Sequence, residues 1–131
     1  MRVISGRFKG FSLPAAGAGT RPTTDRTKEA LFSYLDARDL LDDARVLDLY
    51  AGTGALGIEA LSRGARELIA VEYAGQAVAS LNATFASLRR LRAWSEGLAV
   101  HALRKRAEAY AQSHRGEAFD VIFIDPPYAL S

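Results

Sequence analysis

Short apolar runs separated by helical stretches dominate the chain from residue 45 onward. The apolar runs predict four buried strands, at RVLDLY (45–50), ELIAVE (67–72), LAVHAL (98–103) and FDVIFID (119–125). The spacing of apolar residues between the runs predicts helices over 55–63, 75–91 and 107–112. Strands that alternate with helices favour a mainly parallel sheet. We therefore expect an α/β, Rossmann-like, doubly wound domain over residues 45–131.

Residues 1–44 follow a different pattern. Segment 2–14 places β-favouring residues around a glycine-containing centre, which predicts a short hairpin or a paired extended arm. After a loop, an amphipathic helix is expected to begin at Thr24 or Asp25, both good N-caps. Its periodic positions are Thr27, Leu31, Tyr34 and Leu35. We predict that residues 1–44 form a separate segment that precedes the main domain.

The last predicted strand is very apolar and lies close to the end of the sequence. In a doubly wound sheet of order 3-2-1-4 this strand occupies an edge. Apolar edge strands normally pair with another element or are covered by one. We therefore expect that C-terminal strands of the parent fold are missing from this sequence.

Composition excludes several kinds of chemistry. The 131 residues include no cysteine, which excludes a disulfide framework, a cysteine zinc site and catalysis by a covalent thiolate. His101 and His114 lack the partner spacing of a metal site, so we expect no metal. No signal segment and no membrane-spanning apolar stretch is visible. The expectation is a soluble, cytoplasmic, monomeric protein without a membrane partner.

Basic residues gather in two regions, although the formal net charge is only +2. Residues 1–28 carry six basic side chains and one acidic side chain. The members of the second cluster are Arg89, Arg90, Arg92, Arg104, Lys105 and Arg106. Such clusters suit contact with nucleic acid, and they are equally typical of solvated protein surfaces.

A glycine-rich loop follows the first predicted strand, in the sequence DLYAGTGALG (48–57). Glycines at this junction allow a tight turn and close approach to a ligand, and Gly57 allows the helix to pack near the strand. The next strand ends in Glu72, which could accept two hydrogen bonds from ribose hydroxyls. NAD fits this pattern. However, Asp48 before the loop favours a ligand with an ammonium and a sulfonium, as in S-adenosylmethionine, over a pyrophosphate.

The tetrapeptide DPPY (125–128) ends the fourth predicted strand, which lies beside the first at the switch point of the sheet. Its prolines fix the backbone and leave carbonyl oxygens without amide donors. An exocyclic base amine could donate one hydrogen to the Asp125 carboxylate and one to the Pro126 carbonyl, which favours the pyramidal geometry needed for attack. Tyr128 offers a face on which an extruded base can stack.

Taken together, DLYAGTGALG, Glu72 and DPPY resemble the class I S-adenosylmethionine-dependent amino-methyltransferases. The front segments RVISGRFKGFSLP and RPTTDRTKEALFSYL resemble the bacterial 16S ribosomal RNA guanine-N2 methyltransferase family (RsmD-like). The resemblance implies S-adenosylmethionine as cofactor, and ribosomal RNA or the small ribosomal subunit as partner. It implies a catalytic group formed by Asp125, Pro126 and Tyr128.

The resemblance also implies that residues 1–44 cover the substrate or cofactor, and it implies two groups of binding residues. Those expected to bind the cofactor are Asp48, Tyr50, Gly52, Thr53, Gly54 and Glu72. Those expected to close over the cofactor or to meet RNA are Arg21, Thr23, Thr24 and Arg26.

The sequence departs from the family in its length and at Arg106, which stands where the family usually places an acidic residue near the adenine. Weaker adenine binding is expected. Three alternatives remain open: an adenine-N6 methyltransferase acting on DNA or RNA, an NAD-type nucleotide-binding module, and a catalytically silent fragment.

Overall fold

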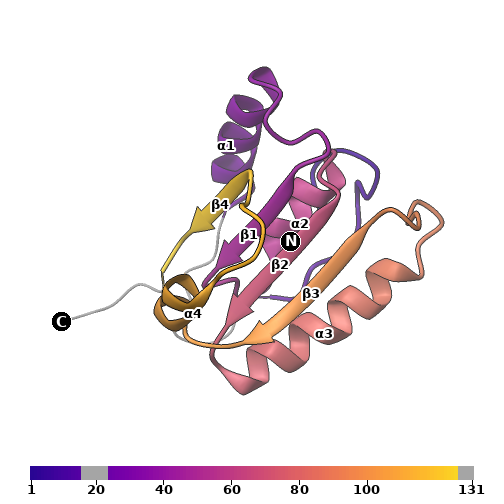
Figure 1. The fold of residues 1–131 in the computed structure, drawn as a ribbon. Coiled ribbons are helices and arrows are strands. Elements are labelled where there is room, and N and C mark those ends of the chain that lie inside the picture. Colours follow the sequence, from indigo (N-terminus) through magenta and orange to yellow (C-terminus); the bar gives the residue numbers. More distant parts are fainter. Residues whose placement is uncertain (16–23, 127–131) are drawn as a thin grey trace.

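The computed structural model describes residues 1–15 and 24–126, and these residues form an α/β fold (Figure 1). Its strands are β1 (Arg45–Leu49), β2 (Glu67–Glu72), β3 (Ala99–Arg104) and β4 (Val121–Ile124). They form one parallel sheet of order β3-β2-β1-β4, as predicted. The helices are α1 (Asp25–Ala37), α2 (Ala55–Ser62), α3 (Gly75–Arg89) and α4 (Ala107–Ser113). None of the helices in the described part is long and apolar enough to cross a membrane.

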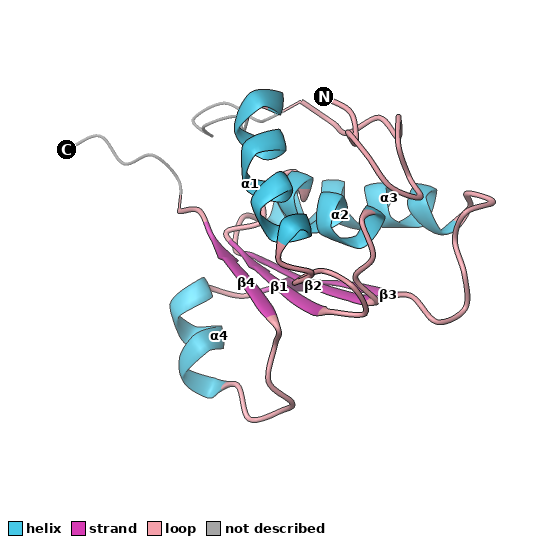
Figure 2. Cartoon of the chain, turned by 90° about the horizontal axis from the view of Figure 1, so that it is seen from above, coloured by secondary structure: helices cyan, strands magenta, loops and turns pink. Residues whose placement is uncertain are grey.

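The two faces of the sheet are covered unequally (Figure 2). Helices α1, α2 and α3 lie over one face, and α4 lies on the other. The larger apolar core belongs to the three-helix side, and its fully buried members include Phe32, Val46, Ile58, Leu68 and Phe85. The smaller core, on the α4 side, consists of Leu47, Leu49, Val71, Ala107 and Tyr110. Strand β1 is buried from both sides because it contributes to both cores.

The N-terminal arm, defined as residues 1–14, is paired with itself through one antiparallel bridge between Arg2 and Ser12, not through a regular hairpin. It packs on the C-terminal half of α2. The Arg7 guanidinium donates to the carbonyl oxygens of Leu61 and Ala65 at 3.0 and 2.7 Å. A Cβ added at Gly6, whose φ is +93°, would lie 2.1 Å from the Ser62 carbonyl oxygen. Only glycine therefore allows this close approach.

A buried ion pair joins the arm, α1 and α2. Lys28 Nζ lies 3.0 Å from Glu59 Oε1, and both side chains are fully buried. The Glu59 carboxylate also accepts hydrogen bonds from the backbone N–H groups of Ile4 and Ser5, at 2.9 and 3.2 Å, and from Arg63 Nε at 2.9 Å. Burial alone would raise the pKa of Glu59, but the bonds from Ile4, Arg63 and Lys28 hold it below its ordinary value.

The predicted packing of α1 is partly wrong. Thr24 caps the helix as expected, because its Oγ1 accepts a hydrogen bond from Thr27 N at 3.1 Å. The buried positions are Lys28, Phe32 and Leu35, whereas Tyr34 is 54% exposed. The Arg38 guanidinium lies 3.6 Å from the centre of the Tyr34 ring, which explains how this aromatic side chain is accommodated outside the core. Sequence periodicity missed the buried lysine because its counter-charge lies on another helix.

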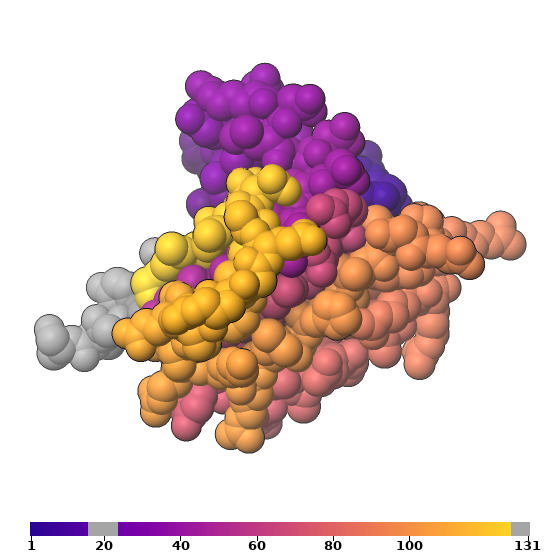
Figure 3. Space-filling view, viewed as in Figure 1, coloured from indigo at the N-terminus to yellow at the C-terminus, as the bar shows by residue number. Residues whose placement is uncertain are grey.

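Strand β4 begins two residues later than the sequence predicts. Phe119 packs against the smaller core and near the His114 ring, and the Asp120 carboxylate accepts a hydrogen bond from Arg45 N at 2.8 Å. Asp120 N also donates to the Arg45 carbonyl oxygen at 2.9 Å, so the chain is already held against the start of β1 before the strand begins at Val121. The strand occupies the edge of the sheet, where Ile122 and Ile124 are 50% and 65% exposed. Figure 3 shows the β4 segment, in yellow, at the molecular surface.

Candidate active site

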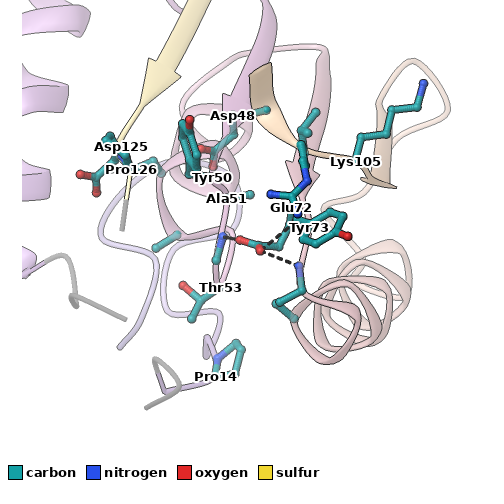
Figure 4. A pocket seen from close by; sticks show the side chains of 18 of the residues that line it. Pro14, Asp48, Tyr50, Ala51, Thr53, Glu72, Tyr73, Lys105, Asp125 and Pro126 are labelled. Carbon is teal, nitrogen blue, oxygen red and sulfur yellow. Dashed lines mark hydrogen bonds between the residues drawn. The ribbon is translucent and has the colours of Figure 1, made fainter. Parts of the chain in front are cut away.

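A cavity of about 640 Å³ lies at the carboxyl ends of the strands. This volume is in the range of sites for nucleoside-sized ligands. Asp48 and Glu72 line it from β1 and β2, and Asp125 and Pro126 line it from the end of β4 (Figure 4). The remaining walls come from the first turns of α2 and α3, the segment 105–108 and the arm. The fold thus brings three strand ends that are far apart in the sequence to one site.

The glycine loop forms the wall between β1 and α2. Gly52 and Gly54 have φ angles of +58° and +83°, in the left-handed region that favours glycine. Gly54 caps α2, and Gly52 and Thr53 line the cavity. At Gly57, an added Cβ would lie 2.4 Å from Leu68 Cδ1 on β2. The predicted close packing of helix against strand is therefore confirmed at Gly57.

Asp48 is a buried carboxyl group directly behind this loop. Asp48 is only 2% exposed, and its Oδ2 accepts a hydrogen bond from Gly57 N at 3.1 Å. Burial is the main cause that raises the pKa of Asp48 to about 8; the Gly57 bond opposes this shift, and the nearby charges of Asp125 and Glu72 add to it. Without a ligand, this carboxyl is mostly protonated at neutral pH. A cation that enters the cavity would favour its ionised form.

The raised pKa of Asp48 predicts an unusual pH dependence of stability. Because the folded chain holds this proton more tightly than the unfolded chain, the stabilisation is present at acidic pH and is lost as pH rises through about 8. Asp48→Asn keeps an acceptor for Gly57 N but cannot ionise. From about pH 5 to about pH 9, wild type should lose at least about 1.4 kcal/mol relative to this variant, the equivalent of one pKa unit. Urea unfolding of both proteins across this pH range measures the difference in their free energies of unfolding. Parallel pH profiles would contradict the raised pKa of Asp48.

Glu72 holds the glycine loop in addition to lining the cavity. Its Oε1 accepts a hydrogen bond from Gly52 N at 3.0 Å, and its Oε2 accepts bonds from Tyr73 N and Ala74 N at 3.0 and 3.1 Å (Figure 4). A carboxylate has about four acceptor positions. One therefore remains available on Oε1. The sequence did not predict this bridge, and ribose binding by Glu72 stays a prediction.

Tyr50 links β1 to the segment that follows β3. Its φ is +58°, an uncommon conformation for a residue other than glycine, at the point where the chain turns into the glycine loop. The Tyr50 hydroxyl donates to Glu108 Oε1, a bond that raises the pKa of Tyr50. Sequence analysis did not select Glu108, which lines the cavity from the first turn of α4. The sequence signal that could have selected Glu108 is its position shortly after the carboxyl end of a predicted strand, where ligand-binding residues gather in parallel sheets.

The predicted catalytic group is only partly described. Asp125 and Pro126 lie in the cavity wall, next to Tyr50 and Asp48 (Figure 4). The register pairs Leu49 with Ile124, which brings Asp125 beside the end of β1. Tyr128 lies outside the described residues. The roles of all three stay predictions.

Two of the four residues expected to cover the cofactor or meet RNA can be placed. Thr24 caps α1 and Arg26 is exposed in its first turn, whereas Arg21 and Thr23 lie outside the described residues. The arm and the residue after it contribute Met1, Pro14 and Ala15 to the cavity wall, and no motif in the sequence indicated these contacts.

The whole chain, residues 1–131, matches the family model described as "Conserved hypothetical protein 95". It is 43% identical to the Bacillus subtilis protein YlbH, over 98% of this chain and 67% of that relative. It is 34% identical to ribosomal RNA small subunit methyltransferase D of Escherichia coli K12, over 98% of this chain and 60% of the relative. The chain thus spans 60–67% of the length of these two curated proteins.

Solved structures give the same picture. The Escherichia coli protein yhhF superimposes with a TM-score of 0.80 at 35% identity, covering 98% of this chain and 65% of that one. A Thermus thermophilus protein, TTHA0928, superimposes with a TM-score of 0.76 at 33% identity, covering 99% of this chain and 71% of that one. The fold described above is therefore similar to part of a larger α/β structure.

Proposed function

This chain belongs to the conserved hypothetical protein 95 family together with YlbH and ribosomal RNA small subunit methyltransferase D, and from this premise we propose a specific activity. It transfers a methyl group from S-adenosylmethionine to the exocyclic N2 of a guanine in 16S ribosomal RNA. The reaction takes place in the cytoplasm, on free RNA or on the small subunit. The observation that carries the proposal is the convergence of Asp48, Glu72 and Asp125 on one cavity.

The cavity residues fit S-adenosylmethionine. The raised pKa of the buried Asp48 suits a site that a cationic ligand completes, because an ammonium or sulfonium nearby stabilises the carboxylate. Gly52 lines the cavity without a side chain, at a positive φ angle that favours glycine. Glu72, with its remaining acceptor position, would hold the ribose. When bound, the cofactor supplies an electrophilic methyl group on sulfur.

Asp125 and Pro126 would activate the guanine amine. The lone pair of an exocyclic amine is delocalised into the base, so the amine is a poor nucleophile until it becomes pyramidal. Donation of its two N–H groups to the Asp125 carboxylate and the Pro126 carbonyl favours that geometry. Held in this way, the amine would present its lone pair to the methyl group that the cofactor would supply from its sulfonium, which would become a neutral thioether, and the displaced amine proton would pass to solvent. Tyr128 would stack on the extruded base.

Two measurements test this proposal. Calorimetric titration of the chain with S-adenosylmethionine, with NAD as control and circular dichroism to verify folding, tests the cofactor. We expect selective binding of S-adenosylmethionine.

Transfer of labelled methyl groups to 16S RNA, small subunits and DNA, followed by nucleoside analysis, tests the substrate. N2-methylguanine is the expected product, whereas a preference for NAD, or label in N6-methyladenine, would overturn the proposal.

A further inference from the structure

Three consecutive cations, Arg104, Lys105 and Arg106, lie where β3 ends, and the last two line the cavity. Arg104 is held in the structure, because its Nε donates to the Tyr73 carbonyl oxygen at 3.1 Å. The Arg106 guanidinium carbon lies 4.2 Å from the centre of the Tyr73 ring, and the Lys105 ammonium lies 6.0 Å from the Tyr110 ring. Aromatic rings therefore orient both of the other cations.

Lys105 and Arg106 differ from most of the arginines in their contacts. Arg7, Arg45 and Arg63 donate to carbonyl or carboxylate oxygens. The side chains of Lys105 and Arg106 form no hydrogen bond or ion pair with any other residue within 1–15 and 24–126. The neighbouring Glu108 carboxylate accepts a hydrogen bond from the Tyr50 hydroxyl. This bond and the positive charge of Arg106 both lower the pKa of Glu108, but the side chains of Arg106 and Glu108 form no hydrogen bond with each other. These two exposed cations are thus available to an external anion.

We propose that Lys105 and Arg106 bind backbone phosphates of the RNA strand that carries the target base to the cavity. This inference rests on the proposed function. Lys105 extends away from the cavity (Figure 4), so its charge faces the outside of the site and not the space beside Glu72. An arginine that is already stacked on an aromatic ring loses less side-chain freedom when it binds a phosphate. Tyr73, which orders it, is 51% exposed and belongs to the same rim.

The position of the pair favours RNA over the cofactor as the anionic partner. The cofactor's cationic groups are assigned to Asp48 at the β1 end, and S-adenosylmethionine carries no phosphate. A strand that delivers a base to Asp125 must cross the mouth of the cavity, where phosphates meet exposed cations. Phosphate contacts of this kind hold the strand in register without reading its sequence.

The test compares two double variants that remove the same charge. Lys105→Ala with Arg106→Ala removes the rim pair. Arg90→Ala with Arg92→Ala removes two exposed cations that follow α3, before β3 begins. Binding of fluorescein-labelled single-stranded RNA is measured by anisotropy at several salt concentrations, without S-adenosylmethionine. The salt dependence reports the number of phosphates neutralised, which a role confined to the cofactor pocket would not alter.

We expect the rim variant to bind RNA about tenfold more weakly and to lower the slope of log affinity against log salt by about 1.4, the value for two phosphate contacts with a single strand. The Arg90 and Arg92 variant should keep the wild-type affinity and slope. Equal losses in both variants would overturn the inference and leave the proposed function standing, as would wild-type RNA binding by the rim variant. If the wild-type chain itself bound no RNA, the result would contradict both this inference and the proposed function.

Discussion

Glu59→Gln is expected to lower the free energy of unfolding by about 3–5 kcal/mol, the usual cost of leaving a buried charge without its partner. The carboxylate is fully buried and contacts Lys28, Arg63 and the backbone N–H groups of Ile4 and Ser5. All four are donors. A glutamine amide nitrogen would face donors instead of accepting from them, and the Lys28 ammonium would keep its charge in an apolar environment. Urea unfolding at neutral pH measures the loss.

Lys28→Met provides the matched control. It removes the other half of the pair but leaves Glu59 with Arg63 and two backbone donors, so it should cost less than Glu59→Gln. The double variant should be more stable than the sum of the two single losses predicts, because replacing Lys28 removes the buried ammonium that Glu59→Gln leaves without its partner. A Glu59→Gln protein within about 1 kcal/mol of wild type would show that the cluster does not hold the arm in place.

Asp125→Ala is expected to reduce the rate of methyl transfer by about 100- to 1,000-fold, the range found when one pre-organised polar partner of a transition state is removed. Asp125 lies in the cavity wall at the end of β4, and its charge contributes to the raised pKa of Asp48. Loss of the acceptor leaves one amine hydrogen of the target base without a partner, so the amine stays planar. Single-turnover kinetics with labelled S-adenosylmethionine measure the chemical step.

Glu96→Ala serves as the control, because it removes an exposed carboxylate in the segment between α3 and β3. It should retain the wild-type rate. The fall in rate for Asp125→Ala should also exceed any fall in its affinity for S-adenosylmethionine. A variant that transfers methyl groups at the wild-type rate would contradict the role assigned to Asp125.

The sheet could be predicted from sequence because each strand is a compact apolar run and each turn has local chemistry. The bounds of β2 are those predicted, and β1 and α2 end one residue early. The β–α alternation predicted a doubly wound parallel sheet, and the order 3-2-1-4 that is usual for this architecture is the observed one. Local patterns therefore suffice where the interactions that define an element are themselves local.

The parts that sequence did not reveal depend on contacts between distant residues. Lys28 reads as a polar helix position, yet it is buried because Glu59 supplies its counter-charge. Glu72 reads as a ligand residue, and its bonds to Gly52, Tyr73 and Ala74 appear only once the strands are aligned. The contribution of Pro14 to the cavity wall has no local signature. No periodicity reports which charged groups meet across the fold.

The attachment of the arm to α2 has a consequence for the order of folding. Ile4 and Ser5 bond to Glu59, and Arg7 bonds to the carbonyls of Leu61 and Ala65, more than 50 positions later in the chain. During synthesis the arm leaves the ribosome before α2, and it therefore lacks its partner until α2 has emerged. Closing a loop of this length costs chain entropy before any contact repays it. The wall of the cavity that includes Met1 and Pro14 is thus expected to be completed late, after the first βαβ unit has formed.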